Sequence, residues 1–301
     1  MKINDDRGRE LHFHASPKRV VSLVPSDTLS VADLGCAAAL VGRTDFCELP
    51  EDVVANIPSV GGTKNPNIDK IADLSPDLVL VNQEENSRGD IEELAKRGIR
   101  IYVAFPKRVA EGISHLAKLA RIFHVERDSK VRVLCKQAYE ALREAESERS
   151  KSEPLRVFCP IWMDPLMTIH GSTFISDMMD LAGAQNIFAD RERRYPLAAD
   201  LGKRAPLSKE KIAERDVRYP RVTFDEVVER SPELILLPDE PHPFSEDDAA
   251  VFRALEVPAA KMDNVVRTNG KDLCWYGSRS AAGIARVRAV IDSAREKKAN
   301  R

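Results

Sequence analysis

Short apolar runs alternate with helix-like stretches along most of the chain. Runs typical of buried strands fall at 19–24, 78–82, 99–104, 155–158 and 234–237, and helix-like runs fall at 26–34, 89–97, 109–122, 172–181 and 279–295. Strands that alternate with helices form parallel sheets whose faces the helices cover. The pattern therefore predicts an α/β fold.

Part of this pattern occurs twice. Residues 68–84 align without a gap with residues 224–240, and six of the seventeen positions are identical, where average composition would give roughly one. Each copy predicts a short helix, a Ser-Pro break and a buried strand, because proline cannot continue a helix. Two similar lobes leave a cleft between them, which is where a ligand usually binds.

The segment between the two copies has a different character. Residues 126–150 contain neither glycine nor proline, and apolar residues recur there every three or four positions, which indicates one helical stripe. At 1.5 Å per residue such a helix is about 36 Å long. It is either an ordinary amphipathic helix on one lobe or a strut that joins two lobes, and the repeat on each side favours the strut. We expect an N-terminal lobe at 1–124, the connecting helix at 125–151 and a C-terminal lobe at 152–301, with little closure because a continuous helix resists bending.

Composition narrows the class of protein. The chain has 301 residues and a net charge of −2, a balance that argues against a nucleic-acid binder. Its five cysteines form no CxxC pair, which argues against a disulfide framework or a thiolate zinc site. No run approaches a membrane span, and the first residues do not resemble a leader. The sequence as written therefore predicts a cytoplasmic protein, or a periplasmic or cell-surface one from which a leader has been removed.

Signatures of catalysis and of metal binding are missing from the sequence. It contains no GxGxxG motif after a strand, no GxxxxGK[ST] phosphate loop and no GxSxG elbow. His12 and His14 alternate as on a strand face, without a third ligand at useful spacing. His170 and His242 lie near predicted loops and could reach a haem or cobalt centre, although a lone histidine is more often structural. We expect no enzyme activity, no resident cofactor and no protein-held metal.

Several segments resemble a known family. They are RVVSLVPS near the start, SVGGTKNPN at 59–67, residues 69–81, GAQNIF at 183–188, YPRV at 219–222 and SPELILL at 231–237. Together with the lobe, helix and lobe order, they resemble helical-backbone substrate-binding proteins of ABC importers, and within that family the vitamin B12-binding proteins. The resemblance implies two Rossmann-like lobes with parallel sheets joined by a long backbone α-helix. It also implies a monomer that delivers a ligand to the importer's membrane subunits; relatives carry corrinoids, haem, ferric siderophores or oxyanions.

Candidate ligand contacts follow the predicted strands, because ligands of parallel sheets collect beyond the carboxyl ends. Aromatic residues make up only 6% of the chain, so aromatics in these loops are candidates for stacking on a flat macrocycle, or else cover the core of their own lobe. The predicted ligand-binding residues are Ser26, Phe46, Lys64, Asn65 and Glu84 in the first lobe and Trp162, Met163, Tyr219, Glu240, Trp275 and Tyr276 in the second.

Four of these residues are chosen for particular reasons. By resemblance, Tyr219 matches a position where B12 binders have tryptophan, and Thr63-Lys64 stands where the matching first-lobe tryptophan is expected. Lys64 could pair with a ligand carboxylate or phosphate, or be a solvated loop lysine. Glu84 and Glu240 occupy equivalent places in the repeat and could bind a cation or accept hydrogen bonds from amides, or be ordinary loop acids.

Asp69 and Asp225 form the matched acidic pair of the repeat. Each lies in the first turn of a predicted helix, where unpaired amides stabilise a carboxylate. In the family that the chain resembles, acids at these positions contact arginines of the membrane transporter, so the resemblance implies a docking role as well.

The sequence thus predicts capture of cobalamin or a related corrinoid or metal chelate for an ABC importer. A haem or ferric-siderophore binding protein is the first alternative. A cytosolic tetrapyrrole-handling enzyme or chaperone on the same fold is the second.

Overall fold

The computed structural model describes residues 1–213 and 215–299, and the chain divides into two compact units. Unit 1 comprises Met1–Glu140 and Trp275–Ala281, and unit 2 comprises Ala141–Cys274 and Ala282–Arg301. The sequence assigned all of 152–301 to one lobe. Instead, a short segment near the carboxyl end belongs to unit 1. The reason is that its side chains pack among those of unit 1, as described below.

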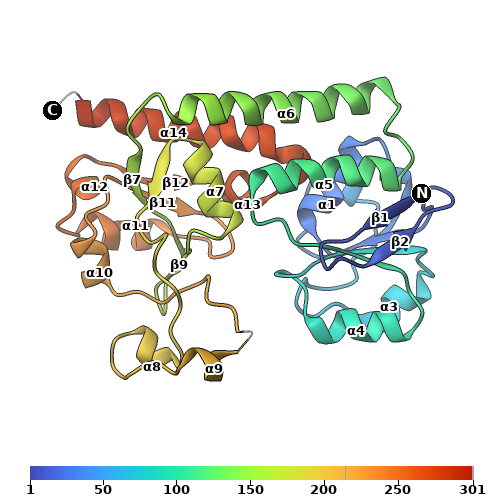
Figure 1. The fold of residues 1–301 in the computed structure, drawn as a ribbon, viewed down its shortest axis with the longest axis horizontal. Coiled ribbons are helices and arrows are strands. Elements are labelled where there is room, and N and C mark those ends of the chain that lie inside the picture. Colours follow the sequence, from blue (N-terminus) through green and yellow to red (C-terminus); the bar gives the residue numbers. More distant parts are fainter. Residues whose placement is uncertain (214, 300–301) are drawn as a thin grey trace. The chain divides into compact units, whose positions relative to one another are not determined.

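Unit 1 is built on a four-stranded parallel sheet in the order β4-β3-β5-β6, with β3 at Val20–Ser22, β4 at Leu40–Arg43, β5 at Leu78–Asn82 and β6 at Ile101–Ala104. Figure 1 shows α3 and α4 on one side of this sheet and α1 and α5 on the other. Apolar residues of α3 and α4 pack with those of β3, β5 and β6 in one buried cluster. The other elements of unit 1 are the hairpin β1 (Lys2–Asn4) and β2 (Glu10–His12), α1 (Pro25–Asp33), η1 (Ala37–Ala39), α2 (Glu51–Val54), α3 (Ile68–Asp73), α4 (Arg88–Lys96), α5 (Val109–Ile122) and η2 (Gly277–Arg279).

Unit 2 repeats this topology. Its parallel sheet has the order β10-β7-β11-β12, with β7 at Leu155–Phe158, β10 at Ala184–Asn186, β11 at Leu234–Pro238 and β12 at Val265–Thr268. A short antiparallel pair, β8 (Pro160–Trp162) and β9 (Met167–Thr168), follows β7. The helices of unit 2 are α7 (Phe174–Leu181), α8 (Leu197–Asp200), α9 (Lys209–Ile212), α10 (Phe224–Glu229), α11 (Glu246–Arg253), α12 (Pro258–Lys261) and α13 (Gly270–Cys274).

The predicted repeat is confirmed down to single residues. Helices α3 and α10 are both six residues long, and both end before a serine in the left-handed region, Ser75 at φ 46° and Ser231 at φ 45°. At the other end, the side chain of Asn67 accepts a hydrogen bond from the Lys70 N–H, and that of Thr223 accepts one from the Glu226 N–H. Such side-chain oxygens satisfy amides that lack a partner in the first helical turn. Each capped helix then leads into a fully buried strand.

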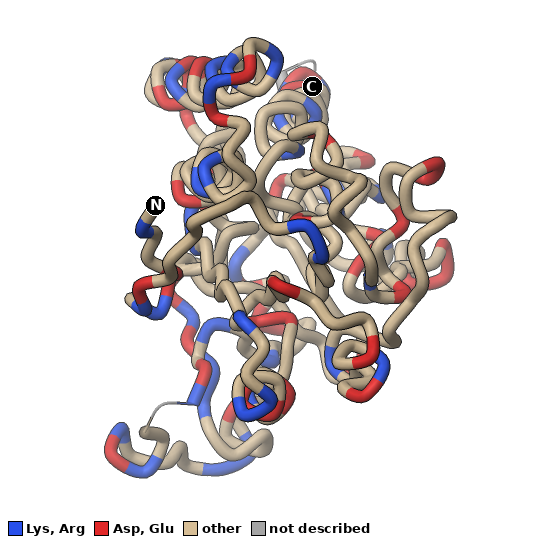
Figure 2. The backbone as a smooth tube through the Cα atoms, turned by 90° about the vertical axis from the view of Figure 1, so that its right-hand side faces the viewer, with Lys and Arg blue, Asp and Glu red and all other residues tan. Residues whose placement is uncertain are grey.

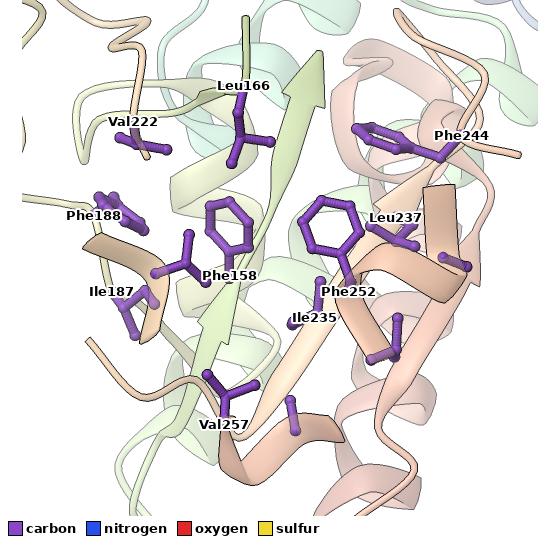
Figure 3. Packing of buried hydrophobic residues seen from close by; sticks show 14 residues of the cluster. Phe158, Leu166, Ile187, Phe188, Val222, Ile235, Leu237, Phe244, Phe252 and Val257 are labelled. Atoms are coloured by element: carbon purple, nitrogen blue, oxygen red, sulfur yellow. The ribbon is translucent and has the colours of Figure 1, made fainter. Parts of the chain in front are cut away.

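The buried cluster of unit 2 is rich in phenylalanine, whereas the cluster that α3 and α4 form with the unit 1 sheet is aliphatic. Figure 3 shows Phe158 of β7 between the rings of Phe188 and Phe252. Their ring centroids lie 5.3 and 6.1 Å from that of Phe158, and both pairs are tilted, an arrangement that aromatic quadrupoles favour over flat stacking. The cluster fixes the central strands, and with them the loops that leave their carboxyl ends.

Two long helices contain the boundaries between the units. Helix α6 (Ser129–Arg149) passes from unit 1 to unit 2 at Glu140–Ala141, and α14 (Ser280–Ala299) does so at Ala281–Ala282. The predicted strut is therefore one unbroken helix, 21 residues and about 31 Å long. The predicted stripe is buried at Val131, Ala138, Leu142 and Ala145. In unit 2 the end of α6 lies beside α14, where Arg288 Nη2 donates to the Ala145 carbonyl (Figure 1).

Candidate functional site

The carboxyl edge of the unit 1 sheet gathers four of the residues that the sequence singled out. Phe46 follows β4 and is 58% exposed, and its ring lies against Gly62. Lys64 Nζ donates a hydrogen bond to the Glu84 carbonyl, which joins the loop before α3 to the loop after β5. Asn65 is exposed beside Lys64. An aromatic face and a cationic side chain thus lie on neighbouring loops.

Two asparagines that the sequence did not single out hold these loops in place. Asn86 Nδ2 donates to the Leu23 and Thr63 carbonyls at 3.1 and 2.9 Å, and Asn86 Oδ1 accepts from the Asn82 N–H at 2.8 Å. Asn82 Oδ1 in turn accepts from the Glu84 N–H at 2.7 Å. Both side chains are buried, where a polar group needs partners. The buried amides of Asn82 and Asn86 therefore hold the loop after β5 in place through hydrogen bonds. Hydrophobic periodicity in the sequence does not reveal this role.

The carboxyl edge of the unit 2 sheet presents Trp162, which is 43% exposed. Its indole Nε1 donates to the Asp164 carbonyl at 3.0 Å, so the ring is held in one orientation. His242 lies 5.3 Å away between ring centroids and also contacts Phe244 edge-on at 4.6 Å. Met163 is partly buried against the core of the unit. Trp162, at the end of β8, and His242, in the loop after β11, therefore form one aromatic surface.

Glu240 is less available than the repeat suggested. The Cys274 thiol donates to Glu240 Oε1 at 3.1 Å, and Lys271 Nζ lies 3.5 Å from Oε2. A carboxylate with these partners already has much of its hydrogen-bonding capacity filled. Its part in ligand binding stays a prediction.

Tyr219 and His170 come together through backbone pairing. The His170 N–H donates to the Arg218 carbonyl at 2.8 Å, and the Thr168 N–H donates to the Pro220 carbonyl at 3.0 Å. The guanidinium of Arg218 lies over the Tyr219 ring at 5.5 Å from its centroid. His170 Nδ1 and the Ser172 hydroxyl are 2.8 Å apart, which explains His170 as a hydrogen-bonded loop residue.

Trp275 and Tyr276 require a correction, because both belong to unit 1 rather than to the C-terminal lobe. They are only 5% and 3% exposed. Asn82 Nδ2 donates to the Tyr276 hydroxyl at 3.2 Å, and the His115 ring meets the Tyr276 ring edge-on at 5.2 Å. Burial raises the pKa of Tyr276 well above its ordinary value. These contacts give the aromatic ring of Tyr276 a structural place inside unit 1.

A buried acid–histidine pair, whose members lie far apart in the sequence, is found beneath the same edge. Asp27 of α1 and His115 of α5 are 0% and 1% exposed, and Asp27 Oδ1 lies 2.7 Å from His115 Nε2. Ser26, a predicted ligand contact, is also buried, at 2% exposed. Tyr102 of β6 flanks His115 at 5.6 Å between ring centroids, and burial raises the pKa of its hydroxyl. This cluster supports the edge from inside the unit.

Comparison with known proteins identifies the family. A family model described as periplasmic binding protein matches residues 20–223. The chain belongs to the periplasmic binding protein family. The vitamin B12-binding protein of Yersinia pestis (strain Pestoides F) is 28% identical over 221 residues, which cover 73% of this chain and 69% of that protein. The vitamin B12-binding protein of Yersinia pseudotuberculosis serotype O:3 (strain YPIII) is 31% identical over 180 residues, covering 60% and 63%.

Solved structures confirm the fold of this periplasmic binding protein. The periplasmic vitamin B12 binding protein BtuF of Vibrio cholerae has a TM-score of 0.73 at 20% identity, covering 93% of this chain and 98% of that one. The periplasmic haem-binding protein RhuT from Roseiflexus sp. RS-1 also has a TM-score of 0.73, at 15% identity, covering 92% and 98%. The chain is thus a substrate-binding protein by family, and the relatives named here are binding proteins.

The matched acids of the repeat are at the surface of this binding protein. The Asp69 side chain is 82% exposed and pairs with Arg97 Nη1 at 2.7 Å. Asp225 is also exposed, in the first turn of α10. Both are placed where another protein could reach them, and their docking role stays a prediction.

Two features are absent from the described residues, 1–213 and 215–299. No three His, Cys, Asp or Glu side chains in this part of the chain lie together as a metal site. No helix in it is long and apolar enough to span a bilayer.

Proposed function

We propose that this protein is the substrate-binding component of an ABC importer and captures cobalamin or a related corrinoid or metal chelate. The observation that carries the proposal is the exposure of Phe46 and Trp162. Each follows a parallel strand at the carboxyl edge of its unit. Exposed aromatic faces beside a few polar groups suit a large, flat and partly apolar ligand.

The named relatives support this ligand class. Vitamin B12-binding proteins match most of the chain in sequence, and a vitamin B12-binding structure shares its fold. The amide groups and Lys64 beside Phe46 would orient a ligand that carries amide side chains and a phosphate. Haem is the second candidate, because haem-binding structures share the fold as well and His242 lies beside the exposed Trp162.

Substitution of the two exposed aromatics tests the proposal. We expect wild-type protein to bind cobalamin in isothermal titration calorimetry, and Phe46→Ala and Trp162→Ala to weaken binding by about tenfold or more, since a stacked aromatic contributes roughly 1–3 kcal/mol. Both variants should keep the wild-type melting temperature because the rings are exposed. Tyr139→Ala is the matched control, since Tyr139 is 38% exposed on α6, away from the sheet edges.

A thermal-shift screen with cobalamin, cobinamide, haem and ferric siderophores then decides the ligand. A tight ligand at a thousandfold excess over its dissociation constant stabilises the folded state by about 4 kcal/mol. A flat response to all four classes would remove the chelate proposal.

We further propose that Asp69 and Asp225 dock to the importer. Charge reversal with Asp69→Lys and Asp225→Lys should leave calorimetric ligand binding unchanged, yet abolish stimulation of the importer's ATPase activity in reconstituted vesicles. Asp73→Lys, at the other end of α3, is the control. Equal loss in all three variants would indicate a general charge effect rather than docking.

A further inference from the structure

One part of unit 2 is strongly cationic although the chain as a whole is not. The segment from Arg191 to Arg221, here named the 191–221 excursion, contains ten Lys or Arg against five Asp or Glu, in a chain whose net charge is −2. It leaves the carboxyl end of β10 and includes α8 and α9 (Figure 1). Figure 2 shows the cationic residues along it in blue. The excursion therefore places positive charge at the edge of the sheet where a ligand is expected.

The two limbs of the excursion are clamped together at their base by Asp200, which is 1% exposed. Its carboxylate accepts hydrogen bonds from the Arg194 N–H at 2.9 Å and the Arg221 N–H at 2.7 Å, and pairs with Arg191 Nη1 at 3.0 Å. The outgoing limb also meets the returning limb directly, where the Arg193 N–H donates to the Val217 carbonyl at 2.7 Å. A buried ion pair with these additional hydrogen bonds fixes the backbone of both limbs.

The clamp joins the limb that carries Arg193 to the limb that carries Arg221, and the charge of one guanidinium acts on the other. The Nε atoms of both arginines are buried, and no described residue accepts a hydrogen bond from either. Within residues 1–213 and 215–299, neither guanidinium forms an ion pair. Burial lowers the pKa of Arg221, and the charge of Arg193 lowers it further. The carboxylates of Asp200 and Asp216 act on Arg221 and Arg193 only from a distance, and two partly desolvated cations without a direct ion pair are costly.

An aromatic ring completes the arrangement. The guanidinium of Arg193 lies 4.5 Å from the centroid of the Tyr195 ring, and that of Arg215 lies 5.3 Å from it. Stacking on a ring holds a guanidinium in one plane and leaves its edge free to donate paired hydrogen bonds. A planar, oriented fork of this kind matches the two oxygens of a carboxylate or phosphate.

We infer that Arg193 and Arg221, beside Tyr195, form an anion-binding site in unit 2 that takes a carboxylate or phosphate group. An anion there accepts the hydrogen bonds that the two guanidinium groups lack and offsets their mutual repulsion. This inference rests on the proposed function in one respect, since it names the chemistry that the captured ligand carries. Cobalamin has a phosphodiester and haem has two carboxylates, whereas cobinamide has neither.

The site is tested with inorganic phosphate and with citrate, titrated separately in a low-salt buffer free of other oxyanions. We expect the wild-type protein to bind at least one of them. Arg193→Gln and Arg221→Gln should each weaken that binding by about tenfold or more, because charge-assisted hydrogen bonds are lost. Arg204→Gln removes the same charge from an exposed position of the same excursion and should change the affinity by less than about twofold. Binding of phosphate alone or of citrate alone identifies which group the site takes.

Circular dichroism and melting temperature establish that the variants are folded. If a glutamine variant fails to fold, Arg193→Lys and Arg221→Lys take its place. Lysine keeps the positive charge but cannot donate the paired hydrogen bonds of a guanidinium, so a weakened affinity for phosphate or citrate in these variants supports the site. The inference is overturned if the wild-type protein binds neither probe at tens of millimolar. It is equally overturned if Arg204→Gln weakens binding as much as Arg193→Gln, since the effect then comes from the diffuse charge of the excursion.

The chelates separate this inference from the proposed function. If Arg193→Gln weakens cobalamin but leaves cobinamide unchanged, both the inference and the proposal are supported. If no chelate binds the wild-type protein while phosphate or citrate binds through Arg193 and Arg221, the proposed ligand class is wrong and the anion site stands.

Discussion

At the scale of single residues, two carboxylates of the repeat perform the same task in the two units. Asp77 accepts hydrogen bonds from the Lys18 and Arg19 N–H groups at 2.7 and 3.1 Å, at the start of β3. Glu233 accepts one from the Arg156 N–H at 3.1 Å, beside the start of β7. In both units an acid immediately before the central strand thus accepts hydrogen bonds from amides at the start of the neighbouring strand, where backbone N–H groups need a partner. This explains why the Asp77/Glu233 pair of the repeat is acidic in both copies.

Replacement of Glu233 should make the stability of unit 2 less sensitive to acid. Burial alone would raise the pKa of Glu233, but hydrogen bonds from Lys298, at 2.6 Å, and from the Arg156 N–H outweigh it, so the pKa lies below its ordinary value. A lowered folded-state pKa stabilises the fold above the unfolded-state pKa of about 4.3, and this stabilisation is lost as pH falls through the folded-state value. We expect Glu233→Gln to lower the free energy of unfolding by about 1–2 kcal/mol at pH 7 and by much less near pH 3.

Urea denaturation at a series of pH values measures this difference. Glu256→Gln is the control, because Glu256 is 83% exposed in its pair with Lys261, and exposed pairs contribute little. A difference between wild type and Glu233→Gln that is constant from pH 7 to pH 3 would show that the ionised carboxylate is not the stabilising species.

At this scale the sequence revealed some site residues and concealed others. Phe46 and Trp162 were found because aromatics are scarce and both were assigned to segments at the ligand-binding edge of a sheet; both are exposed there. Arg193 and Arg221 were not found, because twenty-eight positions separate them and only the clamp at Asp200 brings them together. His115 was hidden for a similar reason, since on an apolar helix face it cannot be distinguished from a core residue until Asp27 is seen beside it.

At the scale of elements, the repeat gives two helices that end in the same unusual way. Ser75 and Ser231 both adopt a left-handed backbone immediately before a proline. This conformation costs a residue with a side chain roughly 1–2 kcal/mol, and glycine adopts it freely. The Ser231 hydroxyl also donates to the Val228 carbonyl at 3.2 Å.

Glycine at these positions should therefore stabilise the two units unequally. We expect Ser75→Gly to raise the free energy of unfolding by about 0.5–1 kcal/mol, after allowance for the greater entropy of glycine in the unfolded chain. Ser231→Gly should give a smaller gain, because it also removes the hydrogen bond to Val228. Denaturant unfolding of the two variants beside wild type measures both values, and a loss of stability in Ser75→Gly would show that the left-handed turn is not strained.

Helices and strands could be predicted from the sequence where apolar residues form a continuous run or recur with a clear period. Central strands such as β5 and β11 are continuous apolar runs, and the stripe of α6 has a clear helical period. Strands β4 (LVGR) and β10 (AQN) were not predicted, because they are short and not continuously apolar. They exist as strands since β3 and β7 offer them hydrogen-bonding edges, which is a tertiary effect that no local pattern contains.

At the scale of the whole molecule, the chain passes from one unit to the other three times. It does so within α6, after Cys274, and within α14. The segment Trp275–Ala281, here named the strap, is therefore joined at both of its ends to residues of unit 2 while it packs in unit 1. The Ser278 N–H donates to Ser30 Oγ of α1 at 3.2 Å, and Tyr276 packs against His115 of α5. The expected boundary at 152 missed the strap because seven residues carry no periodic signal.

Gly277 controls whether the strap can lie against α1. Its φ is +80°, and a Cβ built at this position would overlap the Ser30 hydroxyl. Gly98, at φ +75°, has the same backbone constraint with no atom within 4 Å of such a Cβ. Comparison of Gly98 with Gly277 therefore separates the cost of backbone strain from the cost of steric overlap.

We expect Gly98→Ala to lower the free energy of unfolding by about 1 kcal/mol through backbone strain alone. Gly277→Ala should cost about 2–4 kcal/mol, because overlap with Ser30 adds to the strain. Ser30→Ala removes the hydroxyl that the new methyl group meets, so the double variant should be more stable than the sum of the single changes by about 1 kcal/mol. Denaturant unfolding of wild type, Gly277→Ala, Ser30→Ala and the double variant measures the four free energies of this double-mutant cycle, and Gly98→Ala is measured beside them. Equal costs at Gly98 and Gly277, with no coupling to Ser30, would mean that the strap does not lie against α1 in solution, and the seven residues would then contribute nothing to the stability of unit 1.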